Sequence, residues 1–299
     1  MRLLVHRSLL ASVCLWGLSA TQVWAGPEVI GLYRSPNTAV TFLEAVQHLA
    51  GGVVVFIGEQ HNDQKTHQFE LATLQALADR GDRPVILSME MFETDVQPVL
   101  DDYLADRIDE TAFLAQSRPW PNYKTDYRPL VEFAKAHAIP VIAANAPRPM
   151  ASKVAKEGLE GLQSLAWEVG RQVAVPNNLD RGAPWTRFSV IMGGHQGSAL
   201  DSTWRMYEAQ SLKDATMARS IGLALATLAP QGRVLHIQGR FHSDFHAGVP
   251  AFLKRLMPDQ SLRVMTVVPV SGSAEAHMHG KAELADIVVF VLAAPDKAD

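Results

Sequence analysis

The sequence predicts one α/β domain built on a mostly parallel β-sheet with helices on both faces. Short apolar runs rich in β-branched residues alternate with amphipathic stretches, which is the pattern of successive β-α units. After residue 26, no stretch rich in Pro, Gly and Ser is long enough to divide the chain. Of the 299 residues, 47% are hydrophobic and the net charge is −4, which excludes a disordered chain; we expect no nucleic-acid partner.

Each expected strand is a short apolar run, and each expected helix carries apolar residues at helical spacing. The strands are expected at residues 52–57, 84–89, 140–144, 233–238, 262–268 and 287–292. The helices are expected at residues 63–80, 95–104, 109–116, 129–137, 151–167, 201–228 and 249–256. Residues 117–126 and 175–185 are expected to be loops, 271–280 a mobile segment, and the helices between Asp95 and Tyr127 a small helical insertion.

Residues 1–25 are typical of a secretory signal peptide. Arg2 and Arg7 precede a mostly apolar stretch at 9–18, and Val23-Trp24-Ala25 resembles a cleavage site. The apolar run is too short for a transmembrane anchor, which needs roughly 20 apolar residues. We therefore expect export to a periplasm, with the domain proper covering residues 26–299.

The only cysteine, Cys14, lies inside the expected signal peptide. Val13 precedes it and much of the apolar stretch follows it, so we do not expect a lipid anchor. The mature chain then has no cysteine and a net charge of −6, since cleavage removes Arg2 and Arg7. A chain without cysteine suits an oxidising compartment; attachment to the outer membrane would be peripheral at most.

Polar side chains follow four of the expected strands. Glu59 and His61 follow the first strand, Glu90 the second, Asn145 the third, and His242 the fourth along the chain. Because the carboxyl ends of parallel strands meet at one edge of a sheet, we expect these side chains to converge there. The alternative for each carboxylate is a structural one, at the positive end of a helix dipole.

Two carboxylates at one edge allow several kinds of site. Glu59 and Glu90 could share a proton, hold a divalent metal, or pair with Arg148 or His61. His61 and His67 are six residues apart, a spacing that does not place both on one face of a helical metal site.

Residues 118–128 combine aromatic rings, cations and two prolines. The aromatic residues are Trp120, Tyr123 and Tyr127, and the cations are Arg118, Lys124 and Arg128. Rings and cations together suit a flat apolar ligand with acidic edges, and a tyrosine phenolate can ligate haem iron. The alternative interpretation is an aromatic plug that covers the edge of the sheet.

With these motifs the chain resembles the ChaN family of haem-binding uptake proteins, in a superfamily with Tiki/TraB proteases and erythromycin esterases. The matching stretches are GEQHNDQKTHQFELATLQAL, SMEMFETDVQPVLDDYL, RPWPNYKTDYRPLVEFAKAHAIPVIAANAPR, EAQSLKDATMA and GRFHSDFHAGVP. The resemblance implies a fold like those of ChaN and erythromycin esterase. It also implies haem as cofactor, with Tyr123 or Tyr127 as iron ligand, His195 nearby, and Arg128 and Arg148 at the propionates.

The resemblance further implies a cell-envelope protein of haem or iron acquisition, in which haem can be held between two subunits of a homodimer. An outer-membrane haem receptor or a periplasmic haem carrier would then be a partner. The GEQH and GRFH motifs resemble the catalytic positions of the hydrolase relatives. The alternative function is therefore a hydrolase that uses Glu59, His61, Glu90 and His242, either through a Glu/His base or through a divalent metal.

Overall fold

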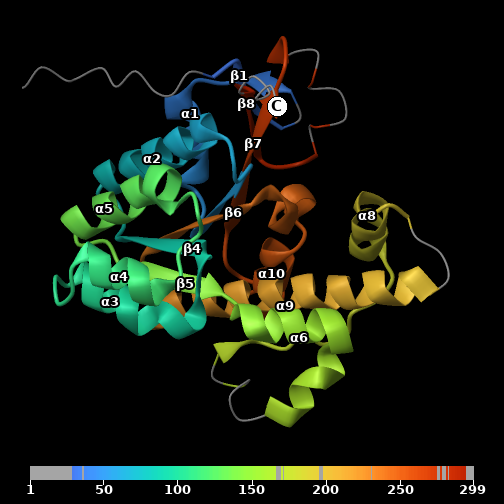
Figure 1. The fold of residues 1–299 in the computed structure, drawn as a ribbon. Helices are drawn as coiled ribbons and strands as arrows, with labels where there is room; N and C mark the ends of the chain where they lie inside the picture. Colours follow the sequence, from blue (N-terminus) through green and yellow to red (C-terminus); the bar gives the residue numbers. More distant parts are fainter. Residues whose placement is uncertain are drawn as a thin grey trace, which may run out of the picture.

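In a computed structural model the chain folds around one β-sheet with helices on both faces (Figure 1). The structure describes residues 29–35, 37–165, 170, 172–194, 198–229, 231–274, 277, 281 and 283–293. The expected signal peptide and parts of the expected mobile segment 271–280 lie outside these residues. Of the helices in the described ranges, none is both long and apolar enough to span a bilayer.

The sheet has eight strands in the order β2-β1-β8-β7-β3-β6-β4-β5. The strands are β1 (Gly31–Arg34), β2 (Thr38–Ala39), β3 (Val54–Glu59), β4 (Val85–Glu93), β5 (Val141–Asn145), β6 (Arg233–Gly239), β7 (Leu262–Val270) and β8 (Ile287–Leu292). The six strands from β8 to β5 are parallel, whereas β1 and β2 add an antiparallel edge beside β8. The predicted α/β fold with a mostly parallel sheet is confirmed.

Helices line both faces of this sheet (Figure 1). They are α1 (Phe42–Leu49), α2 (Gln64–Asp79), α3 (Gln97–Leu104), α4 (Glu110–Ser117), α5 (Arg128–Ala136), α6 (Arg148–Glu157), α8 (Ala183–Ile191), α9 (Ser198–Thr227) and α10 (Val249–Leu256). Alternate side chains of β3 face opposite ways: Val55 and Ile57 join the core under α1 to α5, while Val54 and Phe56 join the core under α9 and α10.

Helices α3 and α4 correspond to the expected helical insertion. Their buried residues Leu100 and Phe113 belong to the same hydrophobic cluster as Val55 and Ile57 of β3. The insertion therefore shares the core of the sheet instead of forming a core of its own.

Several segments differ from the sequence expectation, which placed no element before residue 52 and so missed β1, β2 and α1. The helix expected at 151–167 ends at Gly158, whose φ of 79° lies in the left-handed region that stops a helix. The loop expected at 117–126 ends in a π-helical turn, Tyr123–Tyr127, which buries both tyrosines. The loop expected at 175–185 gives way to α8, which begins at Ala183 and carries Pro184 in its first turn, where a proline is tolerated.

Candidate functional site

The carboxyl ends of β3, β4, β5 and β6 meet at one edge of the sheet. Glu59 ends β3 and pairs in register with Gly239, which ends β6. Glu90 lies near the carboxyl end of β4, and Asn145 ends β5. Parallel pairing carries these side chains to one edge, and Glu59, Glu90 and Asn145 are all buried there.

Three side chains surround the carboxylate of Glu59. Its Oε1 accepts a hydrogen bond of 2.6 Å from the Tyr127 hydroxyl and lies 2.5 Å from Nδ1 of His61. Its Oε2 lies 3.4 Å from Nδ1 of His67. Burial acts to raise the pKa of Glu59, but the hydrogen bonds from His61 and then His67 outweigh it and lower the pKa. Glu59 is therefore a buried carboxylate anion.

His61 is the member of this group that reaches solvent, with 40% of its side chain exposed. Its ring meets the edge of Trp120 with the two centroids 4.8 Å apart. A Cβ at position 239 would lie 2.7 Å from Cε1 and 2.8 Å from Nε2 of His61, so Gly239 allows this close approach. Burial acts to lower the pKa of His61, but the hydrogen bond to Glu59 and its charge raise it.

A second network of buried side chains runs from Glu90 to α9. Glu90 Oε2 accepts a hydrogen bond of 2.7 Å from the backbone N–H of Gly239. Its Oε1 lies 3.4 Å from Nε2 of His242, and Nδ1 of His242 lies 2.5 Å from Oδ1 of Asp214. The imidazole of His242 is thus held between two carboxylates.

The charges of Glu90 and His242 stabilise each other. Burial acts to lower the pKa of His242, but Glu90 and then Asp214 raise it to about 10. Burial acts to raise the pKa of Glu90, but the charge of His242 leads the opposing effects and lowers it to about 2. Burial raises the pKa of Asp214. Glu90 and His242 therefore form a buried ion pair at neutral pH.

His67 and Glu70 complete the polar cluster from the side of α2. Both are buried, and Nδ1 of His67 lies 3.0 Å from Oε2 of Glu70. Burial and then the charge of Glu59 raise the pKa of Glu70 well above its usual range. Sequence analysis considered His67 only together with His61 and missed Glu70, although the spacing of three positions between His67 and Glu70 in an expected helix places them on one face. Glu59 thus has a buried carboxyl neighbour on α2.

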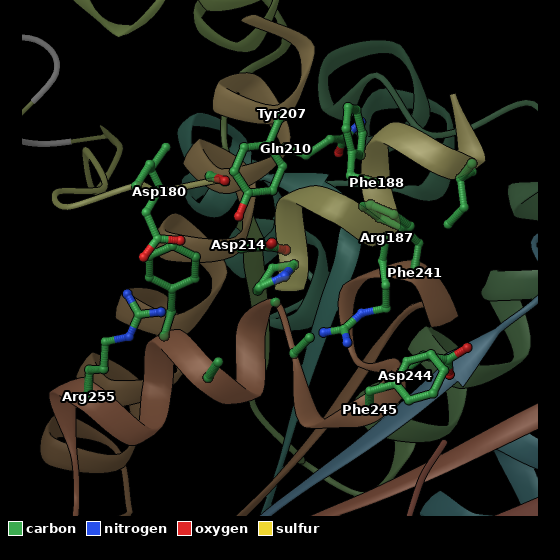
Figure 2. Close-up of a pocket in the computed structure, with 18 of the residues that line it drawn as sticks. Asp180, Arg187, Phe188, Tyr207, Gln210, Asp214, Phe241, Asp244, Phe245 and Arg255 are labelled. Carbon is green, nitrogen blue, oxygen red and sulfur yellow. The ribbon is translucent and has the colours of Figure 1, made fainter. Parts of the chain in front are cut away.

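A cavity of about 820 Å³ opens beside Asp214 (Figure 2). It lies between α8, α9, α10 and the segment after β6. Its aromatic lining consists of Phe188, Tyr207, Phe241, Phe245 and Phe252. No pattern in the sequence predicts this cavity, because its walls form only where the successive helices α8, α9 and α10 pack around the segment after β6.

Three arginines line the same cavity. Arg240 is already paired with Asp244, with its Nη2 2.8 Å from Oδ2. Arg187 and Arg255 instead lie over the rings of Phe245 and Phe252, at 5.0 and 4.8 Å from the centroids.

In the part of the chain that the structure describes, neither Arg187 nor Arg255 has a carboxylate partner. The cavity therefore offers two cations and several rings to a ligand.

The aromatic segment 118–128 covers the edge of the sheet. Tyr123 and Tyr127 are 2% and 0% exposed, and Arg128 binds Glu110 through both Nε and Nη2, at 2.6 and 2.9 Å. Trp120 packs on His61 from the same segment. This arrangement is the aromatic plug considered as the alternative from the sequence.

Of the remaining predicted residues that the structure describes, Arg148 does not line the cavity. Arg148, at the start of α6, is largely exposed, and its Nε lies 3.6 Å from Oε1 of Glu93. His195 lies outside the described residues. Asp214 was not predicted, because a single carboxylate inside a long helical pattern gives no indication of which strand end it meets.

A sequence profile identifies the family of the chain, and solved structures share its fold. A sequence profile described as "Haem-binding uptake, Tiki superfamily, ChaN" matches residues 45–253, more than two thirds of the chain. The structure of "Cofacial heme binding to ChaN of Campylobacter jejuni" is similar with a TM-score of 0.64 and 14% identity, covering 87% of this chain and 95% of that one. An erythromycin esterase, EreC, in its open conformation is similar with a TM-score of 0.52 and 11% identity, covering 89% and 98%.

A plant protein is also similar in sequence to the chain. Protein RETICULATA-RELATED 5, chloroplastic, of Arabidopsis thaliana is 23% identical over 261 residues, which are 83% of this chain. The match spans 35% of that protein, so the chain covers about a third of the length of this relative.

The predicted family is confirmed by the profile and agrees with the fold: the chain belongs to the ChaN family of haem-binding uptake proteins in the Tiki superfamily.

Proposed function

We propose that the protein binds haem in the cavity between α8, α9 and α10 and acts in haem or iron acquisition at the cell envelope. The observation that carries this proposal is the pair Arg187 and Arg255, which lie over phenylalanine rings at the cavity without a carboxylate partner among the described residues. Membership of a haem-binding family supports the same ligand.

The cavity residues suit haem chemically. Haem is a flat apolar ring with two carboxylates, and a cavity of about 820 Å³ lined by five aromatic residues can enclose much of such a ligand. Arg187 and Arg255 would bind the carboxylates, because guanidinium groups form charge-assisted hydrogen bonds with them. Bound haem would supply an iron centre that a tyrosine or histidine side chain can bind.

Tyr207 would be the tyrosine that binds the iron. It lines the cavity, and in Figure 2 its hydroxyl points toward Asp214. The sequence favoured Tyr123 or Tyr127, but both are buried away from the cavity lining, and the Tyr127 hydroxyl already donates to Glu59. Ligation by either would require the segment 118–128 to open.

A haem titration followed by absorbance tests both assignments. We expect saturation at about one haem per chain, and a changed Soret spectrum for Tyr207→Phe. The double variant Tyr123→Phe/Tyr127→Phe serves as the comparison and should keep the wild-type spectrum. A featureless, non-saturating titration would count against haem binding, and a changed spectrum only in the double variant would return the ligand role to segment 118–128.

Export and partners complete the proposal. Residues 1–25 would direct the chain to the periplasm without a lipid anchor, and haem held between two subunits would make a homodimer. An outer-membrane haem receptor or a periplasmic carrier would exchange haem with it. Fractionation of the full chain carrying a C-terminal tag tests the location, and size exclusion with and without haem tests the dimer. A cytoplasmic, unprocessed chain would exclude the periplasmic role.

A second candidate function is hydrolysis at the edge of the sheet. It is favoured by His61, whose Nδ1 is bound by Glu59 while its ring is partly exposed beside the buried Glu90–His242 pair. Glu59 would orient the imidazole, and the other ring nitrogen would take a proton from water.

A panel of ester and amide substrates tests this candidate. We expect turnover by the wild-type protein that falls on the order of a hundredfold or more in His61→Asn. The matched control is His137→Asn, an exposed histidine stacked on Phe133 of α5, which should leave turnover unchanged. Absence of turnover on the whole panel, or equal turnover in both variants, would count against the hydrolase.

A further inference from the structure

Three buried side chains from two elements converge behind His61. Glu59 comes from the end of β3, and His67 and Glu70 come from successive turns of α2. Each offers a ligand atom, and these atoms all lie within 4.8 Å of one another. The three residues are 1%, 4% and 0% exposed, so the group is closed to bulk water.

The second ring nitrogen of His67 fixes which of its atoms faces the carboxylates. Nε2 lies 3.1 Å from the backbone carbonyl oxygen of His61, which can only accept a hydrogen bond. Nε2 therefore keeps a proton in either charge state of His67, and Nδ1 faces Glu59 and Glu70, where it donates in the imidazolium form and offers a lone pair to a metal ion once that proton is lost. Metal-bound histidines are held in this way, with the far nitrogen donating to a carbonyl or carboxylate.

Two carboxylate oxygens in this group are buried without a hydrogen-bond partner. They are Oε2 of Glu59 and Oε1 of Glu70. Within the described ranges, the ion pairs of these two glutamates are with histidines alone. Two buried carboxyl groups face one point, which favours a cation there: the imidazolium of His67, or a metal ion that takes the place of its Nδ1 proton.

The spacing of the donor atoms suits one metal ion. Metal–ligand bonds of about 2.0–2.2 Å place neighbouring donor atoms about 3–3.5 Å apart. Nδ1 of His67 lies 3.0 Å from Oε2 of Glu70 and 3.4 Å from Oε2 of Glu59. The Tyr127 hydroxyl binds the other oxygen of Glu59 and leaves Oε2 free. Only small movements are needed to bring all three donors onto one ion.

We propose that Glu59, His67 and Glu70 bind a divalent first-row transition metal ion such as Zn²⁺ or Mn²⁺. One imidazole with carboxylates suits these ions, whereas Mg²⁺ and Ca²⁺ prefer oxygen donors alone. The ion ties α2 to the end of β3 and fixes Glu59, which in turn holds His61. The inference does not depend on haem binding, because the cavity of the haem proposal is lined by other residues.

Metal content of the purified protein tests the site. Cells are grown with added Zn²⁺ or Mn²⁺, and the folded protein is dialysed and measured by elemental analysis. We expect about one ion per chain in the wild type and a drop of roughly tenfold or more in Glu70→Gln, which keeps the side-chain shape. The matched control is Glu90→Gln, another buried glutamate at the same edge, which should keep its metal. No bound ion in the wild type would overturn the proposal and leave a shared proton as the cation.

X-ray absorption of the Zn²⁺-loaded wild type keeps the test valid if Glu70→Gln fails to fold. We expect nitrogen and oxygen donors at about 2.0–2.2 Å with the multiple-scattering signal of one imidazole. Two imidazoles would instead indicate an ion between His61 and His242 and would overturn the assignment. Loss of metal in Glu90→Gln but not in Glu70→Gln would do the same.

Discussion

The hydroxyl of Tyr127 donates a hydrogen bond of 2.6 Å to Glu59, 68 positions earlier in the chain. This contact joins the π-helical turn of segment 118–128 to the carboxyl end of β3. Both residues are buried, so the bond is shielded from water. A tyrosine that the sequence suggested as an iron ligand thus supports the carboxylate that orients His61.

Replacing Tyr127 should destabilise the fold more than replacing Tyr123. Tyr127→Phe removes a donor from a buried carboxylate, which costs about 1–3 kcal/mol. The hydroxyl of Tyr123 is buried without a hydrogen-bond partner, so Tyr123→Phe should be close to neutral. Urea unfolding of the two variants measures the difference. Equal free energies of unfolding would mean that the Tyr127 hydroxyl does not stabilise Glu59.

A methyl group at position 239 should displace His61. In Gly239→Ala the new Cβ would lie 2.7 Å from Cε1 of His61, closer than atoms tolerate, so the ring must move away from Glu59. The comparison is Gly222→Ala inside α9, where the Cβ meets Met257 at an ordinary 3.5 Å and should stabilise the helix by about 0.5–1 kcal/mol. Nitrogen NMR of the histidine rings reports the displacement. An unchanged His61 signal in Gly239→Ala would contradict the close approach.

The two arginines at the cavity should contribute separately to haem affinity. Arg187→Gln and Arg255→Gln each remove a cation that would bind a carboxylate, and each should raise the haem Kd about tenfold or more. Arg107→Gln provides the control, because Arg107 pairs with Asp102 after α3 and does not line the cavity. Equal haem affinity in all three variants would place the carboxylates elsewhere.

The Glu90–His242 pair should make stability depend on pH in a defined direction. The pKa of His242 is raised from 6.5 to about 10, so its contribution is complete below pH 6.5 and is lost as the pH rises toward 10. The pKa of Glu90 is lowered from 4.5 to about 2, so its contribution is complete above pH 4.5 and is lost as the pH falls toward 2.

Together these shifts predict that the pair stabilises the fold most between pH 4.5 and 6.5. The Tm of the wild type should therefore fall between pH 7 and 10, and His242→Gln should fall less steeply over the same range. Thermal melts of both proteins at matched ionic strength measure this. Parallel Tm profiles would show that His242 is not charged at neutral pH.

The sequence determined which residues stand at the functional edge. Glu59, Glu90, Asn145 and Gly239 end or follow apolar runs, and parallel strands bring such ends together whatever their order in the sheet. Periodicity likewise predicted most helices, because core-facing residues recur at fixed local spacing. The sequence also predicted the family, because the motifs of the family are short stretches of consecutive residues.

Only the tertiary structure decided the partners of these residues. His67 meets Glu59 because α2 packs back on β3, and Asp214 meets His242 because α9 crosses the other face of the sheet. The cavity likewise exists only where α8, α9 and α10 come together. These contacts join distant positions through packing, which leaves no periodic trace in the sequence; the same burial turned Tyr123 and Tyr127 inward.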